Sequence, residues 1–172
     1  MSRPTPEGPS RMPEPRDLLV RAADRAAMQE ESFRHPLNPA SELHGYMLSR
    51  KTGLSRVGLS LLRVPPGKES FIFHAHENEE EFVFVVGGRG IAEIGEASFE
   101  VGPGDFLGFP AGGPAHHLKN PFDEDLVYLA GGENREVEVA DFPRLGKRLV
   151  RMRKEAVVYP VSAGVHLFGE GK

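Results

Sequence analysis

The sequence predicts an all-β domain, and the distribution of turn-forming residues is the main reason. The chain has 20 glycines and 15 prolines among 172 residues. Many stand together and interrupt the chain at short intervals, as in Pro66-Gly67, Gly87-Gly88, Gly102-Pro103-Gly104 and Gly112-Gly113-Pro114. Short apolar segments between such turns are typical of a β-sandwich or barrel. Eight or more of these segments fit a jelly roll or a small barrel.

Nine segments between residues 42 and 132 have the length and composition of β-strands. They are residues 43–49, 55–64, 70–76, 81–86, 90–94, 97–101, 105–109, 115–119 and 126–130. We find no internal repeat and no second domain in this region. Residues 42–132 are therefore expected to form one β-barrel.

The regions on either side of the predicted barrel differ from it in composition. Residues 1–16 contain five prolines among polar residues, and we expect them to be disordered. Residues 17–41 hold an expected helix, capped by Asp17 and continuing to about Glu31, and then a linker. Residues 133–172 form an extension that we expect to pack on the barrel or on a partner.

Composition and charge exclude several classes of function. The chain has no cysteine, so disulfides, thiolate metal sites and cysteine nucleophiles are excluded. The net charge of −4 predicts no nucleic-acid partner. Five basic residues between Lys147 and Lys154 are interpreted as a solvated strand face. No apolar run is long enough to span a membrane, and without an apolar leader at the N-terminus we expect a cytoplasmic protein.

A group of histidines and carboxylates in the sequence indicates a possible metal site. His74 and His76 are two residues apart, so on a strand both side chains point to the same face. An acidic run, Glu77 to Glu81, follows directly, and the doublet His116-His117 comes forty residues later. Three imidazoles and one carboxylate suit a divalent transition metal with positions open for a substrate. A single His-x-His pair or an acidic turn would be weak evidence, but their combination is much stronger.

The spacing of these residues resembles the two motifs of the cupin superfamily. The first motif corresponds to Gly67, His74-x-His76, Glu81 after four residues and Gly88 after six more. The second corresponds to Gly104, Pro110-Ala-Gly112, His116 and Asn120. Two spacings depart from the family pattern by one residue each, from Gly67 to His74 and from Gly112 to His116. The stretch from Gly104 to Gly112 is similar to that of small bacterial single-domain cupins without an assigned reaction.

The resemblance implies a double-stranded β-helix with one metal site. Its ligands would be His74, His76, Glu81 and His116. His117 is the alternative to His116, which keeps the family's spacing to Asn120, and Glu80 is the alternative to Glu81, which keeps the spacing to Gly88. The ion would be divalent manganese, iron, nickel, copper or zinc, since the ligands alone do not decide among them.

Two functions are compatible with such a site. One is a metal-dependent enzyme acting on a small polar molecule as an oxygenase, isomerase or decarboxylase. The alternative is a non-catalytic module that binds or senses a small ligand. The side chains expected near the ligand are Tyr46, Arg50, Arg56, Ile72, Val83, Phe109 and Tyr128.

Four phenylalanines alternate with the expected ligands along their strands. Phe71, Phe73, Phe82 and Phe84 should therefore point away from the barrel interior. So much exposed apolar surface requires a cover. That cover is the N-terminal helix, the C-terminal extension or a second subunit, and we expect a homodimer.

Overall fold

The computed structural model describes residues 13–165, which form antiparallel sheets and a few short helices. The helices are α1 (Ala22–Ala26), α2 (Leu48–Lys51) and three 3-10 turns at Pro15–Leu18, Pro143–Leu145 and Val161–Ala163. The strands are β1 (Glu31–Phe33), β2 (Leu43–Met47), β3 (Val57–Val64), β4 (Lys68–Glu69), β5 (Ala75–His76), β6 (Glu81–Gly87), β7 (Gly90–Ile94), β8 (Ala97–Val101), β9 (Phe106–Phe109), β10 (His116–Asn120), β11 (Leu126–Glu133), β12 (Val137–Phe142), β13 (Lys147–Met152) and β14 (Glu155–Pro160). The all-β prediction is confirmed.

Two sheets form the barrel predicted from the sequence. One has the strand order β1-β2-β3-β11-β6-β9 and the other β4-β10-β7-β8. Apolar residues from both sheets form one continuous core between them: Leu43, Leu62, Val64, Val83, Val85, Ala92, Val101, Leu107, Phe109, Leu118, Leu126 and Tyr128. Alternation of side chains across each strand places these residues inside and leaves polar neighbours outside. The architecture is the double-stranded β-helix that the motifs implied.

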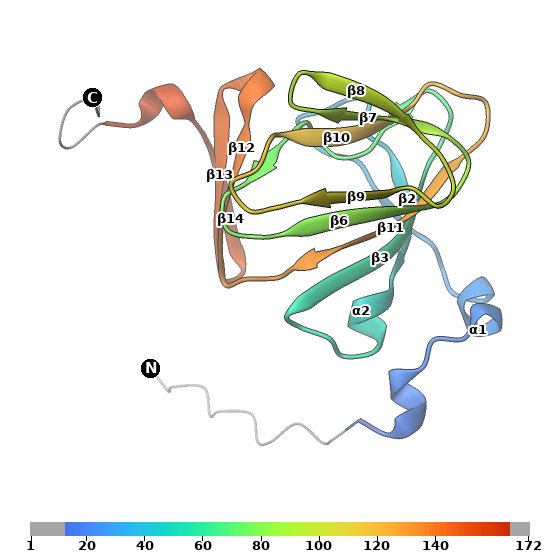
Figure 1. The fold of residues 1–172 in the computed structure, drawn as a ribbon. Coiled ribbons are helices and arrows are strands. Elements are labelled where there is room, and N and C mark those ends of the chain that lie inside the picture. The colour runs from blue at the N-terminus through green and yellow to red at the C-terminus, as the bar shows by residue number, and fades with distance from the viewer. Residues whose placement is uncertain (1–12, 166–172) are drawn as a thin grey trace, which may run out of the picture.

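A third sheet is built mainly by the C-terminal extension. Its order is β14-β13-β12-β5, so the extension pairs with a strand that belongs to the barrel's own sequence. Ala140 pairs with His76 and Asp141 with Ala75. Figure 1 shows β12, β13 and β14 standing across one end of the barrel, at a steep angle to β6, β9 and β10. The extension therefore lies directly beside the strand that carries His76.

The helix predicted from Asp17 to about Glu31 is much shorter in the structure. Pro15–Leu18 forms a 3-10 turn, α1 spans only five residues, and no residue of either is buried. Without an apolar face to bury, so short a segment gains little from continuing as a helix. Figure 1 shows α1 at the edge of the barrel near β2 and β3, where Ala22, Arg25 and Ala26 border a hollow over these strands, and not over β6 and β9. Of the predicted disordered segment, residues 1–12 lie outside the described residues.

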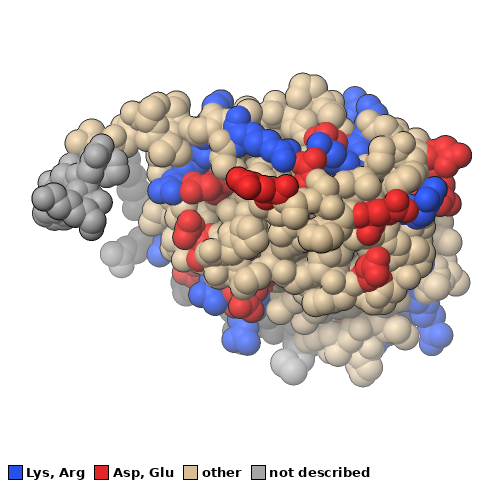
Figure 2. Space-filling model, turned by 45° about the horizontal axis from the view of Figure 1, so that its top comes forward, with Lys and Arg blue, Asp and Glu red and all other residues tan. Residues whose placement is uncertain are grey.

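The surface carries charges of both signs. Figure 2 shows Lys and Arg interspersed with Asp and Glu over the face that it draws. Within the predicted basic cluster, Arg148 pairs with Asp141 and Arg151 with Glu79. None of the described helices is long and apolar enough to cross a membrane.

Candidate metal centre

The four residues implied as ligands come from three places in the barrel wall. His76 lies on β5, Glu81 begins β6 and His116 begins β10. His74 precedes β5 and pairs with His116 through a bridge, in which the N–H of each residue donates to the carbonyl oxygen of the other at 3.2 and 2.7 Å. This pairing fixes two of the histidines directly opposite each other.

The ligand atoms of these residues converge on one point. His74 Nε2 lies 3.0 Å from His76 Nε2, and Glu81 Oε2 lies 3.2 Å from His116 Nε2. Glu81 Oε2 also lies 3.4 Å from His76 Nε2 and 3.8 Å from His74 Nε2. Atoms bound at about 2.1 Å to a single ion lie about 3.0 to 3.4 Å from one another. The donor set and its spacing therefore fit one transition-metal ion.

The three imidazoles are oriented through their second nitrogen. His74 Nδ1 lies 2.7 Å from the carbonyl oxygen of Ile72, and His116 Nδ1 lies 3.2 Å from that of Pro114. His76 Nδ1 lies 3.1 Å from Oε1 of Glu138. Because each partner is an acceptor, each Nδ1 donates a hydrogen bond, and each Nε2 is the ring atom that faces the cluster.

The electrostatics of the cluster favour an ionised carboxylate. Burial alone would raise the pKa of Glu81, but hydrogen bonds from His116, His74 and His76 hold it well below its ordinary value. Burial lowers the pKa of His76, and this effect is outweighed by the hydrogen bonds and charges of Glu81 and Glu138, so the net shift is upward. A cation at the centre would replace these protons as the partner of Glu81.

Aromatic and aliphatic side chains close the floor beneath the ligands. The ring of Phe109 stacks on that of His116, with centroids 3.5 Å apart. Val83, Phe109 and Tyr128 line a space of only about 20 Å³ together with His74, Glu81 and His116. Burial and the charge of Glu81 raise the pKa of Tyr128, which keeps its hydroxyl neutral. This closely packed floor holds the ligands in place.

A hollow opens on the other side of the ligands. It has a volume of about 190 Å³ and is bordered by His76 and Glu81 on one side and by Met47, Leu62 and Phe71 on the other. It limits the molecule that reaches the cluster to a small one.

The structure places the two alternative ligands, His117 and Glu80, away from the cluster. His117 points away from the cluster and lies with Nε2 2.7 Å from Oε2 of Glu93. Glu80 is exposed, and its backbone N–H donates to Glu133. The structure therefore brings His116 and Glu81 to the cluster, and His117 and Glu80 lie outside it.

The other residues expected near the ligand divide into two sets. Val83, Phe109 and Tyr128 lie at the floor. Ile72 packs instead with Ala140 and Phe142 on the outside of the barrel. The hollow next to the ligands includes neither Tyr46, Arg50 nor Arg56 among its lining residues: Tyr46 and Arg50 line other hollows.

The prediction that four phenylalanines point outward is wrong for Phe71. It packs against the barrel core, because residues 70–74 form no continuous strand and side chains there do not alternate regularly. Phe73 does face outward, but the guanidinium of Arg144 covers it at 3.8 Å from the ring centroid. Phe84 is 39% exposed, and Phe82 stacks on Phe106 outside the barrel.

Comparison with known proteins identifies the family. The cupin domain family matches residues 60–131. A protein from Acidithiobacillus ferrooxidans with a proposed sugar phosphate isomerase activity is 34% identical. The alignment covers 91% of this chain and 100% of that one, with a TM-score of 0.86. The chain belongs to the cupin superfamily.

More distant cupins share the fold. A sugar phosphate isomerase of the cupin superfamily from Silicibacter pomeroyi is 24% identical over 81% of this chain and 90% of its own, with a TM-score of 0.71. A predicted oxalate decarboxylase from Thermotoga maritima is 19% identical over 68% and 99%, with a TM-score of 0.57. The comparison with functionally curated proteins finds no match.

Several cupin motif residues have structural roles here. Gly67, Gly88, Gly104 and Gly112 have φ values of +71°, +69°, +98° and +69°. The side-chain amide of buried Asn120 donates to the carbonyl oxygens of Val64 and Glu124 and so fixes the turn before β11. These positions shape the loops of the cupin barrel.

Sequence analysis missed one residue of this cupin's centre, Glu138. It lies on β12 of the extension, is 1% exposed and contacts His76. The local sequence Glu136-Val137-Glu138-Val139 would place the valines inside, yet Val137 is 47% exposed. No signal in the two motifs indicates Glu138, because it lies beyond both.

Proposed function

We propose that this cupin is a metal-dependent enzyme acting on a small polar molecule. One divalent transition ion, Mn, Fe, Ni, Cu or Zn, would be held by His74, His76, Glu81 and His116. The convergence of their four ligand atoms within 4.8 Å of one another carries the proposal. Such an ion supplies a Lewis acid that polarises a bound oxygen atom of the substrate.

The protein's own residues supply orientation and exclusion of water. The acceptors at each Nδ1 hold the imidazoles in one tautomer. The floor formed by Phe109 and Tyr128 keeps solvent from the inner side of the cluster. The hollow beside His76 and Glu81 gives a small molecule access to the cluster.

Among the possible reactions, sugar isomerisation is the first to test. The relative from Acidithiobacillus ferrooxidans is named for that activity and aligns over its whole length. A second hollow, of about 310 Å³, shares Met47, Leu62 and Phe71 with the one at the cluster. It is lined by Arg50, which has no ion-pair partner among the described residues, and this cation suits the anionic end of a phosphorylated sugar.

The metal is tested by elemental analysis of protein purified without added metal. We expect about one transition ion per chain in the wild type and little in His76→Ala, with far-UV circular dichroism unchanged because the barrel core is apolar. His44→Ala is the matched control, since His44 lies outside the cluster and pairs with Glu42. Wild-type protein that stays metal-free and gains no stability from added Mn²⁺, Fe²⁺, Ni²⁺ or Zn²⁺ would refute the proposal.

The reaction is tested by incubating the metal-loaded protein with aldose and ketose phosphates in D₂O. Isomerisation by proton transfer would place deuterium on the carbon next to the carbonyl, which NMR detects. We expect this exchange in the wild type and its loss in metal-stripped protein. Arg50→Ala should raise KM more than it lowers kcat, whereas Lys51→Ala on the same helix should change neither. If the protein binds sugar phosphates but incorporates deuterium into none of them, the non-catalytic binding module would be favoured instead.

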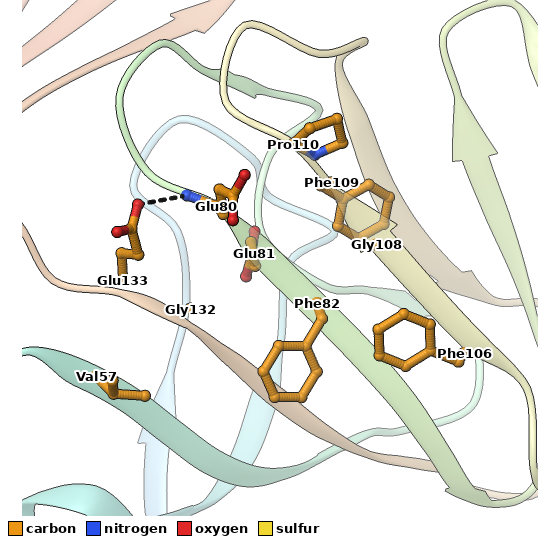
Figure 3. Close-up of a pocket in the computed structure, with 10 residues that line it drawn as sticks. All are labelled: Val57, Glu80, Glu81, Phe82, Phe106, Gly108, Phe109, Pro110, Gly132 and Glu133. Carbon is orange, nitrogen blue, oxygen red and sulfur yellow. Dashed lines mark hydrogen bonds between the residues drawn. The ribbon is translucent and has the colours of Figure 1, made fainter.

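We also propose that the protein is a homodimer that uses the outer face of β6 and β9. Figure 3 shows the rings of Phe82 and Phe106 next to each other on these strands, with Val57 of β3 across the groove. This groove has a volume of about 510 Å³. Phe84, Val86 and Phe106 are 39%, 48% and 66% exposed on the same two strands. A contiguous apolar face of this kind is typical of a protein interface.

A further inference from the structure

We propose that Glu138, on the C-terminal extension, is a positioning residue of the metal centre. Its carboxylate would hold the His76 imidazole in the tautomer that presents Nε2 to the ion. The inference rests on the proposed function, because it is the bound metal that requires this tautomer. It extends the centre beyond the four ligands and beyond the residues matched by the cupin domain family.

The first argument is the contact itself. Glu138 Oε1 lies 3.1 Å from Nδ1 of His76, and the opposite ring nitrogen lies 3.0 Å from Nε2 of His74 inside the cluster. A carboxylate oxygen accepts a hydrogen bond from Nδ1–H and so leaves the lone pair on Nε2. The same contact fixes the rotation of the ring.

The second argument is the contrast with the other two histidines. His74 and His116 each use the backbone carbonyl two residues before them, from Ile72 and Pro114. The equivalent carbonyl for His76 belongs to His74, and it already accepts the N–H of His116 at 2.7 Å. His76 instead takes its acceptor from another strand, and this acceptor is a side chain.

The third argument is the environment of Glu138. Its side chain is 1% exposed, and Oε2 has no hydrogen-bond partner in the described part of the chain. Burying a carboxylate with one oxygen unpaired costs stability, so packing alone does not account for an acid here. Backbone pairing of β12 with β5 holds it in place, since the N–H of Glu77 donates to the carbonyl oxygen of Val139 at 2.8 Å.

A second cation beside His76 is a poorer explanation for this acid. Glu79, Glu138 and His76 do place ligand atoms within 4.8 Å of one another. However, Glu79 Oε1 already accepts the backbone N–H of Arg135 at 2.6 Å and a hydrogen bond from the guanidinium of Arg151. The charge of Glu79 is thus balanced by Arg151, and Glu138 is left with His76.

The test compares Glu138→Leu with Glu138→Gln, using Glu136→Gln as the matched control. Leucine fills the buried space without an acceptor, whereas glutamine keeps an oxygen that can accept from Nδ1–H. Glu136 is exposed and lies two residues away in the same segment. Two properties are measured: the His76 tautomer in metal-free protein, by imidazole ¹H–¹⁵N correlation NMR, and the Kd for Zn²⁺, by competition with a chromophoric chelator.

We expect the Nδ1 atom of His76 to carry a proton in the wild type, in Glu138→Gln and in Glu136→Gln. In Glu138→Leu the Nε2–H tautomer should appear, and the Kd for Zn²⁺ should rise by about 10- to 100-fold, as for other residues that orient a metal-bound histidine. Glu138→Gln should recover most of the affinity, and Glu136→Gln should match the wild type.

Two outcomes overturn the inference: a wild-type His76 without a proton on Nδ1, or a Glu138→Leu variant in which the protonation of Nδ1 and the Kd for Zn²⁺ match the wild type. The first needs no variant and so holds even if Glu138→Leu does not fold. Failure of the proposed function would look different, because the wild type would then bind no Zn²⁺ whatever the tautomer of His76.

Discussion

At the scale of single residues, the doublet His116-His117 shows how one strand serves two purposes. Successive side chains of β10 point to opposite faces, so His116 reaches the cluster and His117 reaches Glu93 outside the barrel. Burial lowers the pKa of His117, although Glu93 opposes the shift. The spacing to Asn120 identified the inward histidine because a strand's alternation is fixed by its register.

Gly88, the last glycine of the first motif, is required by close backbone approach. A Cβ there would lie 2.0 Å from the carbonyl oxygen of Asp125, and its φ is +69°. Gly67 has nearly the same φ, +71°, but open space around it. We expect Gly88→Ala to lower the free energy of unfolding by about 3 kcal/mol and Gly67→Ala by only about 1 kcal/mol.

Urea denaturation of the two glycine variants measures this difference. Because the backbone conformation is matched, the difference between them isolates the clash with Asp125. Equal losses of stability in the two variants would contradict it.

At the scale of elements, an ionic cluster attaches the C-terminal extension to the barrel wall. Glu93 of β7 contacts Lys119 Nζ at 2.8 Å, Arg144 Nη2 at 2.7 Å and His117 Nε2 at 2.7 Å. Burial alone would raise the pKa of Glu93, but these three partners lower it to about 2. Arg144 also covers Phe73, so a single residue of the extension contacts both a charge and a ring.

The shift of Glu93 predicts a pH dependence of stability. A carboxyl group whose pKa is lowered in the folded state stabilises the protein at pH values above 4.5, the ordinary pKa of the group. This contribution to the free energy of unfolding is lost as the pH falls toward 2. Because Arg144 is half exposed, we expect a loss of about 1 to 2 kcal/mol between pH 5 and pH 3. In Glu93→Gln, this part of the dependence of the free energy of unfolding on pH should be absent.

Guanidinium unfolding at several pH values measures the effect. Glu100→Gln is the control, since its pair with Arg89 lies at the surface. A pH slope in Glu93→Gln equal to that of the wild type would argue against the role of Glu93.

The elements differ in how far their sequences predict them. Regular strands with turns on both sides, such as β6 and β10, follow from alternation and spacing, and so do the cluster residues that they carry. Residues 70–74 do not, because backbone hydrogen bonds to β10 replace a regular strand and turn Phe71 inward. On β12 the alternation of valine and glutamate predicts that the valines face inward. Glu138 faces inward instead, where its carboxylate contacts His76.

At the scale of the whole molecule, the outer face of β6 and β9 leaves Phe84, Val86 and Phe106 exposed. The extension lies across one end of the barrel, and the N-terminal segment lies next to β2 and β3 (Figure 1). Neither therefore covers Phe84 and Phe106. A stable interface buries roughly 1,000 Å² or more, and this face with its surrounding loops would need to supply half of that area.

The dimer is tested by sedimentation at micromolar concentration. We expect a dimer for the wild type and a monomer for Phe106→Glu, because a charge at the centre of the face would be buried unpaired. Phe99→Glu is the matched control: Phe99 is 53% exposed but lies on β8 of the other barrel sheet. A monomeric wild type, or dissociation by both variants alike, would count against this interface.

The pairing of β12 with β5 has a consequence for how such proteins diversify. The ligand-bearing strand is two residues long, and its neighbour lies more than 60 residues downstream, outside the matched family domain. Exchange of the extension between related barrels would therefore replace the acceptor of His76 while every ligand stayed in place. The proposed metal site would then change through a segment that comparisons of the two motifs do not include.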